Sequence, residues 1–185
     1  MTICVSGESP KNNFGYNPYY EQWQAVKDRI KVILKEQKCD TVICGMALGI
    51  EQISATAVLE LKKEGYNINL TCILPYKNFG DNWDVSNVNY MKKILAKADK
   101  YFTLTDKEYS FVVTDYHAKY MAKNCDTIIY LCKDKYKTDN SFYKYALENK
   151  KDIIYLTNDE FERKEKKKIV LSDDLDAIRN YKYRM

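Results

Sequence analysis

The stretch TVICGMALGIEQ, residues Thr41–Gln52, joins a short apolar run to two glycines four positions apart and then to an acid, Glu51. An apolar strand that stops at Gly45 and continues as a helix after Gly49 is typical of a strand-to-helix turn. Glycine has two explanations in such a turn. Either the fold needs a positive φ or a close backbone approach there, or a ligand approaches the backbone.

The rest of the chain repeats this alternation of strand and helix. Short β-rich runs occupy residues 2–7, 41–45, 68–75, 100–105, 126–132 and 152–157, and helix-period segments occupy 20–37, 49–65, 86–100, 110–124 and 141–151. Strands that are apolar on both faces and joined by helices are what a parallel sheet covered on both sides requires. The sequence therefore predicts an α/β class, a Rossmann-like parallel sheet with helices on both faces.

The chain has 185 residues and no Pro-rich or Ser/Gly-rich linker, which indicates one domain over residues 1–157. Residues 158–185 are strongly charged, with the run ERKEKKK at Glu162–Lys168. We expect this extension to pack on the domain edge or to be partly mobile.

Composition argues against several classes of protein. The formal net charge of +4 is spread along the chain, so nucleic acid is not the expected partner. The cysteines form no CxxC pair and lie in apolar runs, which indicates buried thiols in a reducing compartment and no metal site. No signal peptide and no run of membrane-spanning length is visible. We expect a cytoplasmic protein without membrane contact, metal or cofactor.

Loops at the carboxyl ends of parallel strands hold the ligands of such sheets, and here their motifs resemble the YpsA-like branch of the SLOG superfamily. The motifs are GESP at Gly7–Pro10, CGMALGIE at Cys44–Glu51, ILPYKNFGDNW at Ile73–Trp83, KEY at Lys107–Tyr109 and HAKYMAKNCDTIIYL at His117–Leu131. The resemblance covers roughly residues 2–156. That superfamily also includes the DNA-processing DprA proteins and the Lonely-guy phosphoribohydrolases. The resemblance implies a Rossmann-like fold that holds a nucleotide or nucleotide-derived ligand.

The glycine-rich loop matches the family's ligand loop, and its position before a helix suits a phosphate, because free backbone N–H groups at a helix N-terminus bind anions. Glu51 stands where relatives usually carry Asp. It either stabilises the helix dipole, which is worth ~0.3–1 kcal/mol, or bonds a ribose hydroxyl. Both interpretations stay open.

The chain departs from the family pattern at three places. Glu8 and Ser9 replace a His-Arg pair, and a glutamate repels phosphate where an arginine would bind it. His117 stands where relatives carry Arg, so it is either a helix-surface replacement for a basic residue or a ligand contact. The segment Lys137–Ser141 lacks the glycines of a second phosphate loop, although its polar residues can cap the next helix or donate to a ligand.

Two loop aromatics, Trp83 and Tyr109, either stack on a base or pack in the core. The complete set of predicted ligand-binding residues follows from these motifs. It comprises Gly7, Glu8, Ser9, Gly45, Met46, Ala47, Leu48, Gly49, Glu51, Pro75, Trp83, Tyr109, His117, Asp139, Asn140 and Ser141.

The favoured function is binding of a nucleotide-type ligand, ADP-ribose-like or cyclic, by a stand-alone SLOG domain that senses or sequesters it. The resemblance implies that such small members occur in mobile elements, including phage counter-defence systems. One alternative is an N-glycosidic-bond hydrolase of the Lonely-guy type, but its Pro-Gly-Gly-x-Gly-Thr signature is missing, so we expect no catalytic residue. Another is a DprA-like binder of single-stranded DNA. We also expect a homo-oligomer, a dimer paired through the apolar faces of residues 54–63 and 90–98.

Overall fold

The computed structural model describes residues 1–137 and 140–162, which form one six-stranded parallel sheet. The strands are β1 (Thr2–Gly7), β2 (Thr41–Cys44), β3 (Asn69–Leu74), β4 (Lys100–Thr103), β5 (Thr127–Cys132) and β6 (Asp152–Thr157). Their order across the sheet is β4-β3-β2-β1-β5-β6. The predicted Rossmann-like α/β class is confirmed.

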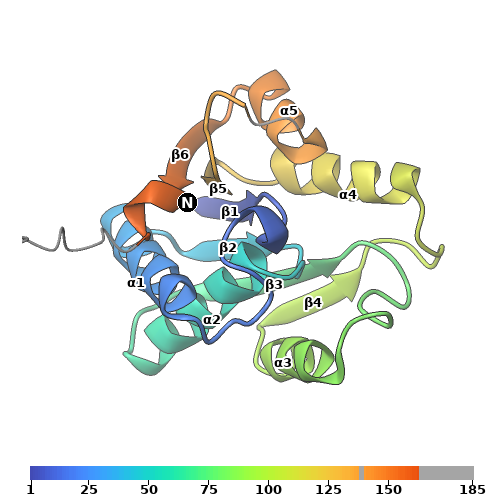
Figure 1. Ribbon diagram of the computed structural model, residues 1–185, viewed down its shortest axis with the longest axis horizontal. Coiled ribbons are helices and arrows are strands. Elements are labelled where there is room, and N and C mark those ends of the chain that lie inside the picture. Colours follow the sequence, from blue (N-terminus) through green and yellow to red (C-terminus); the bar gives the residue numbers. More distant parts are fainter. Residues whose placement is uncertain (138–139, 163–185) are drawn as a thin grey trace, which may run out of the picture.

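Helices cover both faces of the sheet, as predicted (Figure 1). The helices are α1 (Glu21–Glu36), α2 (Ile50–Lys63), α3 (Val85–Leu95), α4 (Phe111–Lys123) and α5 (Ser141–Glu148). One core cluster joins α1, α2 and α3 to one face, and a second joins α4 and α5 to the other. The helices that connect β1 to β4 therefore lie on one face of the sheet, and those that connect β4 to β6 lie on the other.

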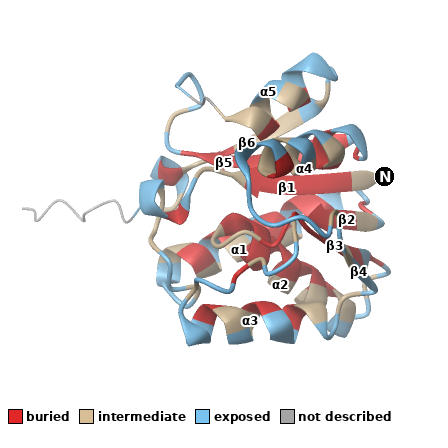
Figure 2. Ribbon diagram, turned by 90° about the vertical axis from the view of Figure 1, so that its right-hand side faces the viewer, coloured by how far each residue is buried: buried red, intermediate tan, exposed pale blue. Residues whose placement is uncertain are grey.

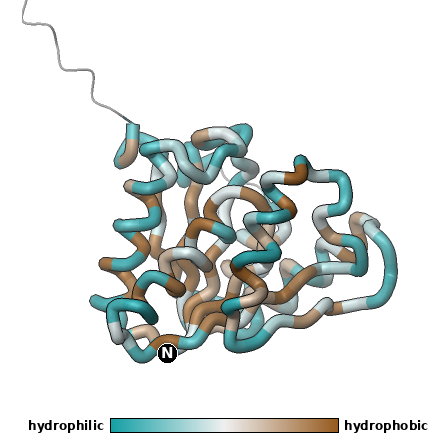
Figure 3. The backbone as a smooth tube through the Cα atoms, turned by 90° about the horizontal axis from the view of Figure 1, so that it is seen from below, coloured by the Kyte–Doolittle hydropathy of each residue, from teal (hydrophilic) through white to brown (hydrophobic). Residues whose placement is uncertain are grey.

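Burial follows the position of each strand in the sheet (Figure 2). The central strand β5, with the sequence TIIYLC, is buried at every position, whereas the edge strand β4, KYFT, is mostly exposed. A central parallel strand is covered on both faces, so it needs a continuous apolar run. In Figure 3 hydrophobic segments accordingly concentrate in the strands, and the helices alternate between hydrophobic and hydrophilic turns.

The chain reverses its direction of travel across the sheet at β1. This strand pairs with β2 on one side and with β5 on the other. Open parallel sheets bind ligands beyond the carboxyl ends of their strands, and such a reversal opens a crevice between the loops there. The loops after β1, β2, β3 and β5 are therefore the places to look for a site.

The helix faces expected to pair two copies are used inside the domain. α2 lies against α1 and α3, and its Ala55, Ala57, Val58 and Leu61 are fully buried. These residues of α2 are thus used inside the domain, and the pairing of two copies stays a prediction. No helix among the described residues is long and apolar enough to cross a membrane.

The expected charged extension begins where β6 ends. Its first residues form a short 3₁₀ helix, Asn158–Glu160, and Asn158 Nδ2 donates to Asn12 O at 2.9 Å. The ring of Phe161 packs edge-to-face on Phe14, with centroids 6.3 Å apart. These contacts tie residues 158–161 to the domain. Residues 163–185 lie outside the described residues.

Candidate functional site

A first cavity of about 260 Å³ lies at the carboxyl ends of β1 and β2. It is lined by Gly7, Glu8, Ser9, Pro10, Ala47, Leu48, Ile50, Glu51, Phe79 and Trp83. All of these except Pro10, Ile50 and Phe79 belong to the residues predicted from the sequence. Three loops that are distant in the sequence therefore meet around one space.

Glu51 lines this cavity from the first turn of α2 and also fixes the loop after β2 by hydrogen bonds. Its Oε1 accepts a hydrogen bond from the Ser6 hydroxyl at 2.9 Å, and its Oε2 accepts one from the Ala47 N–H at 2.9 Å. Burial raises the pKa of the Glu51 carboxyl, and the bonds from Ala47 and Ser6 partly offset that rise. Glu51 thus stabilises the loop directly as well as lying at the helix start.

Gly49 is explained by the fold itself. It is the N-cap of α2, with φ 89° and ψ −132°. A Cβ atom here would lie 2.8 Å from Pro10 Cγ and 3.2 Å from the Trp23 ring. Both the backbone conformation and the contacts therefore require glycine.

Gly45 is explained by a close approach of three segments. A Cβ atom on Gly45 would lie 2.6 Å from His117 Cε1, 2.7 Å from Glu51 Oε2 and 2.8 Å from Met121 Sδ. Because Gly45 has no side chain, α4 can approach the start of α2 closely at this point. His117 and Glu51 consequently lie close to each other beside Gly45.

Met46 takes the left-handed conformation that a glycine would adopt more readily, with φ 68°. Its side chain is fully buried in the core, and its carbonyl accepts a bond from Gln52 Nε2 at 3.0 Å. Neither Met46 nor the flanking Gly45 and Gly49 lines the first cavity; Ala47 and Leu48 are the loop residues that do. The glycine-rich loop lines the first cavity with its middle residues, not with its glycines.

His117 lies between α4 and the sheet rather than on the helix surface. Its Nε2 is 2.7 Å from the carbonyl oxygen of Ile73 at the end of β3. Because a carbonyl oxygen only accepts, Nε2 carries the proton and Nδ1 is the unprotonated nitrogen of the neutral ring. Burial lowers the pKa of His117, and the bond to Ile73 partly opposes that change.

Because His117 is the single histidine of the chain, its pKa and its tautomer can be measured without overlap from other histidines. We expect the His117 imidazole to titrate below its ordinary pKa of 6.5 and to carry its neutral-state proton on Nε2. A nitrogen–proton correlation spectrum of the ring reports both properties. Because the folded-state pKa is lowered, the stabilising contribution is fully present above 6.5 and is lost as the pH falls through the folded-state value. A midpoint above 6.5 would contradict the burial of the ring, and a proton on Nδ1 would contradict the contact with Ile73.

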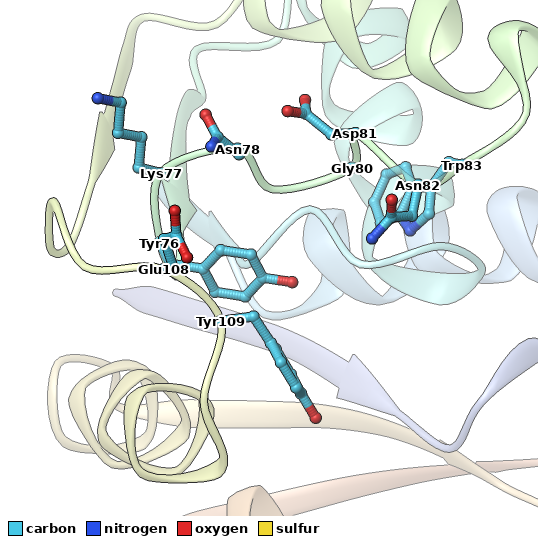
Figure 4. Close-up of a pocket in the computed structure, with 9 residues that line it drawn as sticks. All are labelled: Tyr76, Lys77, Asn78, Gly80, Asp81, Asn82, Trp83, Glu108 and Tyr109. Carbon is cyan, nitrogen blue, oxygen red and sulfur yellow. The ribbon is translucent and has the colours of Figure 1, made fainter.

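A second cavity of about 520 Å³ adjoins the first, and Trp83 lines both. It is lined by Tyr76, Lys77, Asn78, Gly80, Asp81, Asn82, Trp83, Glu108 and Tyr109. Figure 4 shows the Tyr76 ring projecting beneath the turn that carries Asn78 and Asp81, and Lys77 directed away from the other side chains. Only Trp83 and Tyr109 of this set were predicted, although the loop ILPYKNFGDNW that supplies most of it is a recognisable strand-end motif.

Four aromatic side chains form a row that connects the two cavities. Tyr109 packs on Tyr76, Tyr76 on Phe79 and Phe79 on Trp83, each edge-to-face, with ring centroids 5.6, 5.3 and 4.9 Å apart. Such pairs are stabilised beyond their buried area by ~0.5–1.5 kcal/mol each. This aromatic row holds the loops after β3 and β4 together at the site.

The other predicted residues that the structure describes line neither cavity. Pro75 is buried just after β3. Asn140 caps α5, since its Oδ1 accepts from the Tyr143 N–H at 2.8 Å while its Nδ2 donates to the Tyr130 hydroxyl. Ser141 begins α5, and Asp139 lies outside the described residues.

Glu8 also lines a larger third cavity of about 940 Å³ formed with the loops after β5 and β6. Its Oε2 accepts a bond from the Lys133 N–H at 3.3 Å. The side chain is therefore drawn towards β5. In the described part of the chain no group of His, Cys, Asp or Glu residues is placed to hold a metal ion.

Comparisons with known proteins found a matching family and similar chains. A sequence model described as the YspA SLOG family matches residues 18–165. A UPF0398 protein of Lactobacillus delbrueckii subsp. bulgaricus is 37% identical over 83 residues, which are 45% of this chain and 44% of that protein. A UPF0398 protein of Listeria welshimeri is 34% identical over 87 residues, 45% of this chain and 48% of that protein. The matched regions thus span less than half the length of these relatives.

A solved structure shares the fold. DNA processing protein A (DprA) from Streptococcus pneumoniae superposes with a TM-score of 0.56 over 83% of this chain and 49% of that chain, at 13% sequence identity. At this identity the likeness concerns the fold alone.

Proposed function

Since this chain belongs to the YspA SLOG family, we propose that its two adjoining cavities bind a nucleotide or nucleotide-derived signal, ADP-ribose-like or cyclic, which the protein senses or sequesters. One observation carries the proposal: Trp83 lines both cavities. The first cavity lies at the start of α2, and the second has aromatic walls. The second cavity, about 520 Å³, is in the size range of small-molecule sites.

The two cavities suit different parts of such a ligand. Tyr76, Trp83 and Tyr109 offer ring faces and edges to a base. The first cavity lies at the N-terminus of α2, where the N-cap Gly49 provides no side-chain hydrogen bond and the helix dipole favours an anion. Glu51 lines the same cavity, and its oxygens keep lone pairs that accept from ribose hydroxyls.

The charge of the cavities supports a small ligand over a polyanion. Glu8, Glu51, Asp81 and Glu108 line them, and Lys77 is the basic residue among their described lining side chains. Single-stranded DNA is bound along positively charged grooves. This balance supports a ligand that carries few phosphates.

The test is calorimetry with ADP-ribose, AMP and cyclic AMP, combined with the variant Trp83→Ala. Loss of the shared ring should weaken binding by about 5- to 150-fold, because a stacked base is worth ~1–3 kcal/mol. Tyr116→Ala is the matched control, since Tyr116 is 53% exposed and lines none of the described cavities. Thermal melts of both variants separate lost binding from lost folding. Absence of binding by all three ligands to the wild-type protein would refute the proposal.

A further inference from the structure

A fourth cavity, of about 410 Å³, lies between the loop that precedes α1 and the start of α3. Residues 16–19 of the loop line it on one side, and Asp84, Ser86, Asn87 and Tyr90 line it on the other. It shares none of its described lining residues with the first two cavities. We infer that this cavity binds the ring of an uncharged sugar.

Asn87 is the residue that indicates a ligand. It is 8% exposed, and among the described residues none hydrogen bonds with its side-chain amide. Buried polar side chains in folded proteins nearly always have a hydrogen-bond partner. The partner of this amide therefore comes from what fills the cavity, and about 410 Å³ is many times the ~30 Å³ of one water.

Tyrosine rings form the apolar walls of the cavity. Tyr19 and Tyr90 pack edge-to-face, with ring centroids 5.9 Å apart and ring planes at 76°. The Tyr19 N–H donates to Asn17 Oδ1 at 3.0 Å, which fixes the backbone of the loop. Tyr16 and Tyr19 are nevertheless 51% and 72% exposed, so the fold leaves ring surface uncovered. Aromatic rings bury apolar surface well, and a pyranose ring presents C–H groups on its faces.

The hydroxyl of Tyr90 supplies an acceptor at a defined place. Thr56 Oγ1 donates to Gln52 O at 3.0 Å, so the single proton of the Thr56 hydroxyl is already used. The Tyr90 hydroxyl, 2.7 Å from Thr56 Oγ1, therefore donates to Thr56. Its own oxygen keeps the capacity to accept.

The charges around the cavity argue against an ionised ligand. No Lys, Arg or His is among the described lining residues, so an anionic group would face the Asp84 carboxylate without a counter-charge. An ammonium group offers no acceptor to the Asn87 amide, and the N-terminus of α3, with roughly +0.5 charge, opposes it.

Sugar hydroxyls match the polar lining. Asp84 does not bond to the first turn of α3 and only accepts, whereas Ser86 and Asn87 both donate and accept. Each hydroxyl of a sugar also donates and accepts, so one ring satisfies donors and acceptors together without introducing a charge.

Nuclear magnetic resonance of the isotope-labelled protein tests the site with the methyl pyranosides of glucose, galactose and mannose. We expect at least one of them to shift the side-chain amide resonances of Asn87. That glycoside should bind about fivefold or more tightly than its 6-phosphate or its 2-amino derivative, because the added charge is unfavourable in this cavity.

The variant Asn87→Leu separates a ligand contact from a structural role. Leucine keeps the volume, and because the fold gives the amide no bond, the urea midpoint should stay unchanged or rise. Binding of the glycoside should weaken about fivefold or more, the value of the lost hydrogen bonds. Asn89→Leu is the control, since Asn89 lies on the same helix, is exposed and lines none of the described cavities.

Three results would each overturn the inference. The first is an Asn87 amide that none of the three pyranosides shifts. The second is a charged derivative that binds as tightly as the neutral glycoside, and the third is wild-type affinity in Asn87→Leu. Because the fourth cavity is lined separately, Trp83→Ala should leave glycoside binding unchanged whatever its effect on nucleotides.

Discussion

Gly49→Ala is expected to lower the free energy of unfolding by about 3 kcal/mol, because it adds backbone strain and an overpacked contact at one position. The backbone has φ 89° and ψ −132°, a combination that residues with a side chain rarely adopt. The new methyl group would also lie 2.8 Å from Pro10 Cγ. Urea denaturation of the variant measures the loss.

Gly65→Ala is the matched control for this variant. Gly65 has a similar φ of 85°, but a Cβ atom there has no neighbour within 4 Å. It should therefore lose only the conformational part, roughly 1 kcal/mol. Equal losses of stability in the two variants would mean that Pro10 and Trp23 shift without an energetic penalty. Glycine would then be required at position 49 for its φ alone.

Glu51→Ala is expected to lower the free energy of unfolding by about 2 kcal/mol, because it leaves the Ala47 N–H and the Ser6 hydroxyl without their acceptor. Glu51→Gln should cost much less. Its carbonyl oxygen replaces the acceptor of Ala47, and its amide donates to Ser6, whose hydroxyl can accept. The two variants thus separate loss of the hydrogen bonds from loss of the charge.

The difference in stability between the wild type and Glu51→Gln should change with pH in a defined direction. Burial raises the folded-state pKa of Glu51 above its ordinary value of 4.5, so the folded protein binds the proton more tightly than the unfolded chain. That contribution is fully present below 4.5 and is lost as the pH rises through the folded-state pKa. The stability of the wild type relative to Glu51→Gln should therefore fall with rising pH over this window. A difference that grows with pH would contradict the buried position of the carboxyl.

Local patterns were sufficient to predict the strands and the class of sheet. The runs at residues 2–7 and 152–157 match β1 and β6 to the residue, because each is a short β-rich run with clear ends. The helix predicted for residues 86–100 instead ends at Leu95. Asp99 Oδ2 accepts from the Leu70 N–H at 2.7 Å, and this contact with β3, distant in the sequence, ties the following segment to the sheet.

The sequence predicted only the parts of the candidate site that come from one local motif. The stretch Cys44–Glu51 located the loop of the first cavity. The reasons for its glycines lie elsewhere in the chain, at Pro10 and Trp23 for Gly49 and at His117 for Gly45. Tertiary contacts of this kind leave no local periodicity. For the same reason the sequence did not predict the contact of the His117 ring with the end of β3, and a ligand contact of His117 stays a prediction.

The aromatic row has a consequence for motion. Its rings touch edge-to-face along the whole line from Tyr109 to Trp83, so a ring at one end cannot tilt far without displacing its neighbour. Tyr109, 68% exposed, belongs to the loop before α4, and Trp83 belongs to the loop before α3. These two loops should therefore change conformation as one cooperative unit, and a molecule that immobilises Tyr109 at the solvent end should slow the ring flips of Tyr76 and Phe79.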